Sequence, residues 1–117
     1  MAAMRILLVV LFGTLMAYTF VVIRQDGMDF MSVFFGDIAR IGWPGQFNFD
    51  FMTMLTLSAT WTAWRNRFSA HGLGLAVLAF LFGGGFLCLY LLFLLSRHKG
   101  DAAAILLGEA RAAELRK

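Results

Sequence analysis

Long apolar runs alternate with short polar segments along this chain. The first run, residues 6–23, holds no charged side chain and lies between Arg5 and Arg24. As a helix it would rise about 27 Å, which is close to the thickness of a bilayer's hydrocarbon layer. A cleaved signal peptide is the alternative, but the run exceeds the usual apolar region of about 7–15 residues and no A-x-A cleavage pattern follows it. We therefore predict a first transmembrane helix over residues 6–23.

Two further runs predict a second and a third transmembrane helix, over residues 47–64 and 73–95. Trp61 and Trp64 lie near the end of the second run, where aromatic side chains anchor helices at the membrane surface. The connection between these two runs is short, so the helices are expected to pack antiparallel. The pattern thus predicts an all-α membrane protein whose residues 1–99 form an antiparallel bundle of three transmembrane helices.

The loop between the first two runs has a helical period of its own. Over residues 29–41, apolar side chains recur on one face and polar side chains on the other. The segment is too short to span a membrane, and Gly42 and Pro44 are expected to end it. We predict an amphipathic helix in the membrane interface, with an irregular loop as the alternative. The side chains predicted to lie in the interface are Phe30, Phe34, Ile38, Ile41 and Trp43, together with Trp61 and Trp64.

Residues 100–117 form a polar tail. Asp101 is placed to cap a helix that would end near Arg116. We predict one short C-terminal helix that lies on the surface or contacts a partner.

Composition supports a membrane protein and adds little chemistry. The chain is 61% hydrophobic and 15% charged, whereas soluble domains are about half apolar and one quarter charged. The net charge of +3 comes from Lys and Arg beside the apolar runs, a pattern typical of anchoring in lipid rather than of nucleic-acid binding. The single cysteine, Cys88, lies in an apolar run and excludes an intrachain disulfide. No spacing of His, Cys or Glu predicts a metal site, and no motif predicts a cofactor.

The predicted spans divide the basic residues between two sides of the membrane. Their balance slightly favours a cytoplasmic C-terminal tail. On the side of the N-terminus lie Arg5, Arg65 and Arg67; on the other side lie Arg24, Arg40, Arg97, Lys99 and Arg111.

Small residues recur along the first and third predicted spans. They allow helix backbones to approach closely in lipid, so they predict packing within one molecule, with a homodimer face as the alternative. Three consecutive glycines in the third span would also suit a kink, a hinge or a ligand's approach to the backbone. The set is Gly13, Ala17, Gly72, Ala76, Ala79, Gly83, Gly84 and Gly85.

Asp50 is the acidic residue within the predicted spans. At 100° per residue, Thr53, Thr56 and Thr60 share a narrow helix face, and Asp50 lies at its edge. One interpretation makes Asp50 an acid in the first helical turn, with Asn48 as a cap and threonines bonded to their own helix. The other makes it a working carboxylate in a polar cleft. The candidate partners for such a site are Tyr18, Arg24, Asp37, Arg40 and Tyr90.

Four segments resemble a small bacterial membrane family that is described as a domain of unknown function. The segments are "LFGTLMAY", "DGMDFMSVFFGDI", "FNFDFMTML" and "GGGFLCLYLLFLLSR". The family often has an acid at the position of Asp50. It also tends to have an acid where this chain has Asn66, and often a proline late in the third helix that this chain lacks. The resemblance implies a three-span bacterial inner-membrane protein of unassigned activity.

Three classes of function are compatible with these patterns. The first is a non-catalytic component of the cell's inner membrane that acts in the lipid bilayer with another membrane protein or as a homo-oligomer. The second is a transporter or channel subunit with a polar path at Asp50 and the threonine face, which would need an oligomer because three helices enclose no pore. The third is a lipid-acting enzyme, similar to a terpene cyclase, with Asp50 as general acid and an aromatic lining for an apolar substrate.

Overall fold

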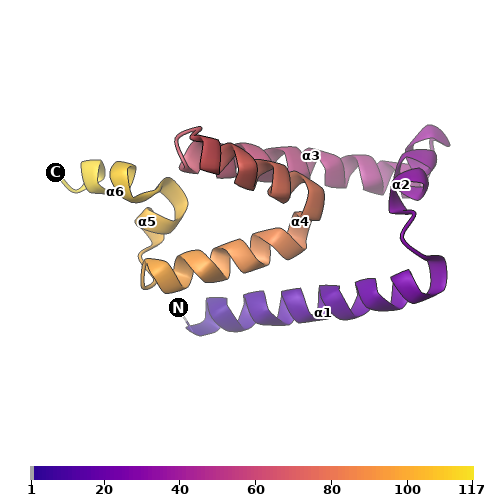
Figure 1. The fold of residues 1–117 in the computed structure, drawn as a ribbon, viewed down its shortest axis with the longest axis horizontal. Helices are drawn as coiled ribbons and strands as arrows, with labels where there is room; N and C mark the ends of the chain where they lie inside the picture. Colours follow the sequence, from indigo (N-terminus) through magenta and orange to yellow (C-terminus); the bar gives the residue numbers. More distant parts are fainter. Residues whose placement is uncertain (1) are drawn as a thin grey trace.

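The computed structural model describes residues 2–117, which form helices and turns and contain no strand. The molecule is elongated, with extents of 53 × 27 × 24 Å, and its long helices follow the longest axis (Figure 1). In chain order the helices are α1 (Ala2–Asp26), α2 (Phe30–Ala39), α3 (Trp43–Arg65), α4 (Ala70–Arg97), α5 (Ala102–Leu107) and α6 (Glu109–Leu115). The predicted all-α class is therefore confirmed.

Within residues 2–117, two helices are long and apolar enough to cross a membrane, namely α1 and α4. Helix α3 has 23 residues, which is long enough for a span, but it carries more polar side chains. The predicted bundle of three transmembrane helices is thus not confirmed. Helix α3 is not among the two candidates, and α4, although long enough in total, is interrupted at Gly83.

Helix α4 is not straight. Its backbone leaves the helical region at Gly83, where φ is 55° and ψ is −127°. Residues 70–82 run alongside α3, and residues 84–97 then return toward the end from which they came (Figure 1). Gly83 is buried, and a Cβ atom there would lie 2.9 Å from the Phe51 ring and 3.0 Å from Leu55 of α3. A residue without a side chain is needed both for the positive φ and for this close approach.

Helices α1 and α3 pack on opposite sides of α4 (Figure 1). Leu8 is the buried residue of α1, and Phe12 packs beside it against the core. One helical turn further, Leu15 and Met16 lie near Gly84 and Gly85 of α4. Because these residues recur every three or four positions, α1 contacts α4 along a single stripe.

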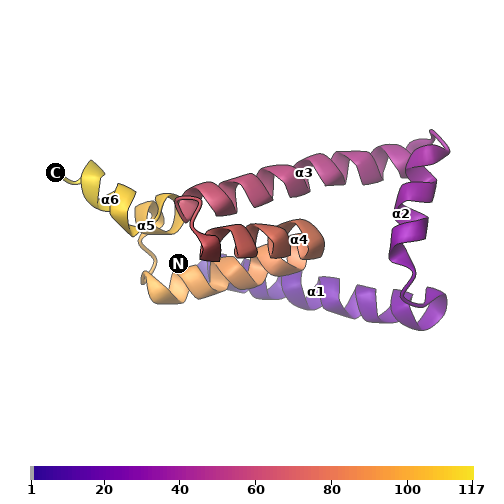
Figure 2. The ribbon, with the colours of Figure 1, turned by 45° about the horizontal axis from the view of Figure 1, so that its top comes forward.

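Helix α2 connects α1 to α3 at the end of the molecule remote from both chain termini (Figure 2). Asp29 caps it by accepting a hydrogen bond from the Ser32 backbone N–H at 3.4 Å. The predicted helix over residues 29–41 therefore exists, with slightly narrower bounds. Pro44 lies in the first turn of α3 rather than only ending α2, since proline's fixed φ suits a helix start. Helix α3 thus begins four residues before the predicted span at residue 47.

The C-terminal segment lies at the opposite end, beside the start of α1. Asp101 caps α5 as predicted, accepting from the Ala104 backbone N–H at 3.4 Å. The predicted single helix is instead two short ones, because Gly108 has φ of 90° and separates α5 from α6. Both chain termini are therefore at one end of the molecule (Figure 1). We call this the termini end and the other the α2 end.

Candidate functional site

Asp50 is exposed, and its carboxylate has no hydrogen bond or ion pair within residues 2–117. Because α3 starts at Trp43, Asp50 lies about two turns into the helix rather than in its first turn. The predicted first-turn position is therefore wrong. The predicted cap is wrong as well: the N-cap residue is Gly42, and the Asn48 amide donates instead to the Phe34 carbonyl of α2 at 3.2 Å.

The threonines near Asp50 are bonded to their own helix. Thr53 Oγ1 donates to the Asp50 carbonyl at 2.6 Å. Thr56 and Thr60 donate to the carbonyls of Met52 and Thr56, at 2.9 and 2.8 Å. Each hydroxyl therefore uses its proton locally, as threonine often does within a helix.

The candidate partners of Asp50 are engaged elsewhere or lie apart from it. Arg40 pairs with Asp37 at 3.4 Å, and the Arg24 guanidinium lies 5.8 Å from the centre of the Phe20 ring. Tyr18 is 73% exposed. Tyr90 belongs to a polar network near the far end of α3. The structure thus does not bring together the polar cleft that the second interpretation requires.

A hollow of about 700 Å³ adjoins Asp50 where α2 meets α3. Most of its lining is apolar, and Asp50 and Thr53 lie on it beside Ile38, Trp43 and Phe49. Two predicted interfacial residues on this hollow are exposed, Ile41 at 91% and Trp43 at 71%, and Phe30 at the start of α2 is exposed as well. Phe34 instead packs edge-on against Phe35, with ring centres 5.2 Å apart.

The small residues have divergent surroundings. Ala79 is completely buried, Ala76 is half-buried, and Gly72 packs against Asn66 in the turn before α4. On α1, Gly13 has no neighbouring side chain within 4 Å of its Cβ direction, and Ala17 is exposed. The stripe on α4 is thus packed within the molecule, and the stripe on α1 is not.

A polar site that the sequence did not predict surrounds Arg65, the last residue of α3. Arg65 is only 7% exposed. Its guanidinium donates to the carbonyls of Ala104, at 3.0 Å, and Ile105. These are among the last carbonyls of α5: Ala104 also accepts from the Gly108 backbone N–H at 3.0 Å, whereas no backbone donor reaches Ile105 within residues 2–117. Trp61 Nε1 donates to the next carbonyl, Leu106, at 3.0 Å, so α3 caps the C-terminal end of α5.

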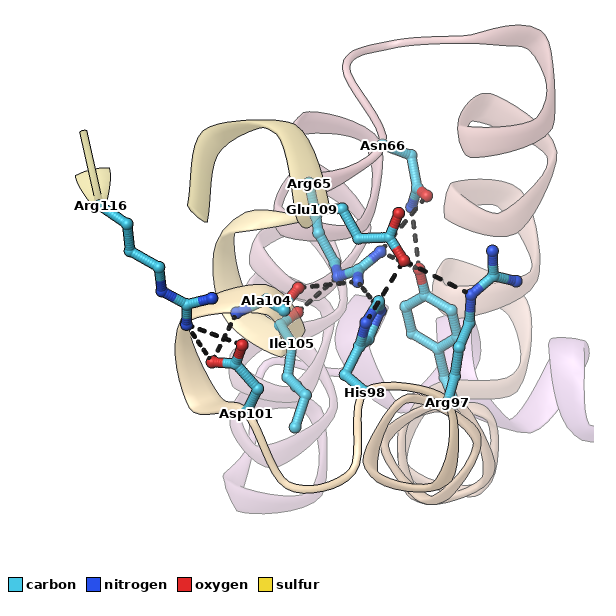
Figure 3. A network of polar contacts seen from close by, with 10 residues as sticks. Arg65, Asn66, Arg97, His98, Asp101, Ala104, Ile105, Glu109 and Arg116 are labelled. Atoms are coloured by element: carbon cyan, nitrogen blue, oxygen red, sulfur yellow. Dashed lines mark hydrogen bonds and ion pairs between the residues drawn. The ribbon is translucent and has the colours of Figure 1, made fainter. Parts of the chain in front are cut away.

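The remaining contacts of Arg65 join it to α4 (Figure 3). One terminal nitrogen lies 3.4 Å from the Tyr90 hydroxyl, which also accepts from the Asn66 amide at 2.9 Å. The other terminal nitrogen lies 3.1 Å from His98 Nε2. Since arginine only donates, Nε2 is the acceptor, and the His98 proton is then on Nδ1, 3.5 Å from a Glu109 oxygen.

Close backbone contact completes the docking of the C-terminal segment. A Cβ atom on Gly108 would lie 2.7 Å from the Arg65 carbonyl oxygen. The Arg111 guanidinium lies 4.1 Å from the centre of the Trp64 ring, and it donates to the Trp64 carbonyl. Trp61 and Trp64, predicted as membrane anchors, therefore also hold this segment.

An exposed ion pair closes the outer edge of this region. Arg116 donates to both carboxylate oxygens of Asp101, at 2.6 and 2.7 Å. This hydrogen bond holds the pKa of Asp101 below its ordinary value. Asp101 therefore both caps α5 and fixes the end of α6.

Sequence reasoning missed this network because it treated Arg65, Asn66 and Arg67 as a basic flank. One signal was present: residues 102–107 are entirely apolar, which is unusual for a tail in water. Nothing in the sequence pairs that segment with Arg65, since the contact depends on backbone carbonyls.

Comparisons of the chain matched no protein-family model, no curated protein and no solved structure. The resemblance to the bacterial membrane family therefore stays a prediction.

Proposed function

We propose that this protein is a small, non-catalytic integral membrane protein that acts with a second copy or with another membrane protein. The observation that carries this proposal is the exposed apolar surface of α1. Outside its stripe on α4, side chains such as Ile6 (65%), Tyr18 (73%) and Phe20 (61%) are exposed. Soluble monomers rarely expose large contiguous apolar patches. Lipid and a partner helix are the surroundings that suit α1.

The arrangement of the helices suggests how the protein sits in a bilayer. In this proposal α1 and α3 cross the membrane, and α4 enters from the termini end and returns to it. Residues 70–82 rise about 20 Å as a helix, less than the hydrocarbon thickness of about 30 Å. The break at Gly83 is compatible with membrane depth because it is buried against α3, and non-helical backbone is tolerated there only when protein covers it.

The distribution of charge suggests the orientation. Among the Lys and Arg residues, Arg24 and Arg40 lie near α2, and the others belong to the termini end. Asp26, Asp29 and Asp37 also lie near α2. Basic residues favour the cytoplasmic side, so we place both termini in the cytoplasm. The tail stays on the side favoured by the sequence, and the N-terminus joins it there.

Two measurements on the full chain test the proposal. After expression, we expect the protein to remain in the membrane pellet during an alkaline carbonate wash. In mild detergent, light scattering should give the mass of at least two copies, or of a stable complex with another membrane protein. Release by carbonate would contradict the membrane assignment, and a strict monomer without companion would contradict the need for a partner.

A lipid-acting enzyme is the second candidate, because Asp50 lies on the apolar hollow between α2 and α3. An acid beside an apolar cavity is what protonation of a hydrocarbon substrate would require. Native mass spectrometry should then detect a lipid whose conversion stops in Asp50→Asn and continues in Thr56→Val. Unchanged lipid content in both variants would remove this candidate. The transporter alternative has no comparable support, since the threonine protons are already used within α3.

A further inference from the structure

A cleft of about 650 Å³ opens at the termini end, between the end of α3, both halves of α4, and α6. Its volume falls within the range of small-molecule sites, which is about 300–1,000 Å³. Cationic side chains dominate its polar lining. They are Arg65, Arg67, Arg97 and Arg111, and the imidazoles of His71 and His98 also line the cleft.

The positive charge in this cleft is poorly balanced. Glu109 is the acidic residue of the lining, and its carboxylate is directed to Arg97 at 3.9 Å and to His98 at 3.5 Å. Within residues 2–117, no carboxylate oxygen lies within 4 Å of Arg65, Arg67 or Arg111. A charge as buried as that of Arg65 is costly without a counter-ion. The cleft therefore favours an anion.

The arginines have different parts in such a site. The N–H groups of Arg65 are already donated to Ala104, Ile105, Asn66, Tyr90 and His98, so Arg65 contributes charge rather than a free donor. Arg67 and Arg97 are exposed, and their guanidinium groups are able to turn toward a ligand. A guanidinium group often binds a phosphate group through two parallel N–H···O hydrogen bonds.

The other wall of the cleft is apolar. Leu75 and Phe86 pack on the core, and Leu89 and Phe93 are 51% and 55% exposed. These side chains all come from α4. A free inorganic anion would leave this wall uncovered. A molecule with an anionic head and a hydrocarbon chain would cover both walls.

We propose that this cleft binds an anionic phospholipid, with the phosphate headgroup at Arg67 and Arg97 and an acyl chain along Phe86, Leu89 and Phe93. The binding rests on the membrane location proposed above, with the termini end at the surface of the bilayer. The anionic lipids of the cytoplasmic leaflet attract basic residues near the membrane surface. The buried charge of Arg65 and the apolar wall then select a bound lipid over general surface attraction.

The test uses the full chain in a neutral detergent and titrates three probes. They are short-chain phosphatidylglycerol, which is anionic, phosphatidylcholine of the same chain length, which is zwitterionic, and inorganic phosphate. Native mass spectrometry counts bound lipid, and thermal stability reports binding of each probe. We expect phosphatidylglycerol to bind roughly tenfold or more tightly than phosphatidylcholine. We expect inorganic phosphate to bind more weakly than phosphatidylglycerol.

Two double variants decide where the lipid binds. Arg67→Gln with Arg97→Gln removes two charges from the cleft and one exposed ion pair. Arg24→Gln with Arg40→Gln removes two charges and one exposed ion pair from the α2 end. We expect the first variant to weaken phosphatidylglycerol binding roughly tenfold or more, and the second to leave it within about twofold.

Three results would overturn the proposal. Equal binding of the two lipids would remove the anionic specificity. Equal weakening by the two double variants would assign binding to general surface charge. Inorganic phosphate binding as tightly as phosphatidylglycerol would make the cleft a site for a free anion. None of these results depends on oligomerisation, so failure here is distinguishable from failure of the proposed function, which the light-scattering mass and carbonate wash test.

Discussion

The termini end and the α2 end differ in how their polar and charged side chains are bonded. At the termini end, polar groups from α3, α4 and α5 bond to one another, and Arg65 is buried among them. At the α2 end, Asp50 is exposed and unbonded among the described residues, and Arg40 forms only an exposed pair with Asp37. The termini end is basic, whereas the α2 end has more acids than bases.

This contrast shows that the position of a charged residue in or beside a span does not reveal whether it makes tertiary contacts. Asp50 stands out in the sequence because it interrupts an apolar run, yet nothing in the structure depends on its charge. Arg65 resembles an ordinary basic flank, yet it holds α5 to the end of α3 and contacts Tyr90 and His98.

The largest expected effect is at Arg65. Arg65→Met leaves the Ile105 carbonyl without a donor and removes the bonds to Ala104, Tyr90 and His98, although Ala104 keeps its bond from the Gly108 N–H. We therefore expect a loss of about 3 kcal/mol in the free energy of unfolding. Arg67→Met, in the exposed turn two residues later, should change it by less than about 0.5 kcal/mol. Denaturant titration in mixed micelles measures both. Equal losses in the two variants would show that Arg65 is not the anchor.

The next effect is at Gly83. Gly83→Ala places a side chain at a positive φ and against Phe51, so we expect a loss of about 1–3 kcal/mol. Gly84→Ala is the matched control, because its Cβ would meet Leu15 at an ordinary 3.7 Å. The same titration compares the two. A Gly83→Ala protein as stable as Gly84→Ala would argue against the fold-back of α4.

A small effect is expected at Asp50. Asp50→Asn removes a charge that has no partner within residues 2–117. This charge lies beyond the first helical turn, which is where the helix dipole acts most strongly. We expect the free energy of unfolding to change by less than about 0.5 kcal/mol, with Thr56→Val as a control on the same face. A loss of several kcal/mol would reveal a buried partner for this carboxylate.

The smallest effect concerns pH at the outer edge of the termini end. The hydrogen bond from Arg116 lowers the pKa of Asp101, so the pair contributes stability above the ordinary pKa of about 3.9 and loses it as pH falls through the lowered value. NMR titration of the Asp101 carboxyl should show the lowered pKa. Arg116→Gln should return it toward the ordinary value, and an unchanged titration in that variant would refute the pairing.

The sequence predicts the helices better than their arrangement. Apolar periodicity located α1, α2 and α3, and Asp101 marked the start of α5. The sequence predicted an unbroken third span over residues 73–95 and offered a kink at the three glycines only as one alternative, because a glycine in lipid also suits a straight, tightly packed helix. The full reversal at Gly83 was not predicted. The conformation is decided by Phe51 and Leu55, which are far away in sequence.

The Arg65 site was beyond sequence reasoning for a similar reason. Two of its acceptors are backbone carbonyls about forty positions later. Every residue has such a carbonyl, so the residue types do not show which ones accept. For Asp50, the threonine pattern was visible, but the position of the helix start depended on Pro44. Residue types thus indicated candidates, and tertiary contacts decided among them.

Because α4 turns back at Gly83, we predict that both chain termini share one side of the membrane. Single cysteines at Ala3 and at Lys117, each in a Cys88→Ala background, should be labelled by an impermeant maleimide from the same side of sealed vesicles. A cysteine at Gln25, near α2, should be labelled from the other side. Labelling of positions 3 and 117 from opposite sides would contradict the shared location of the termini and would indicate three full spans.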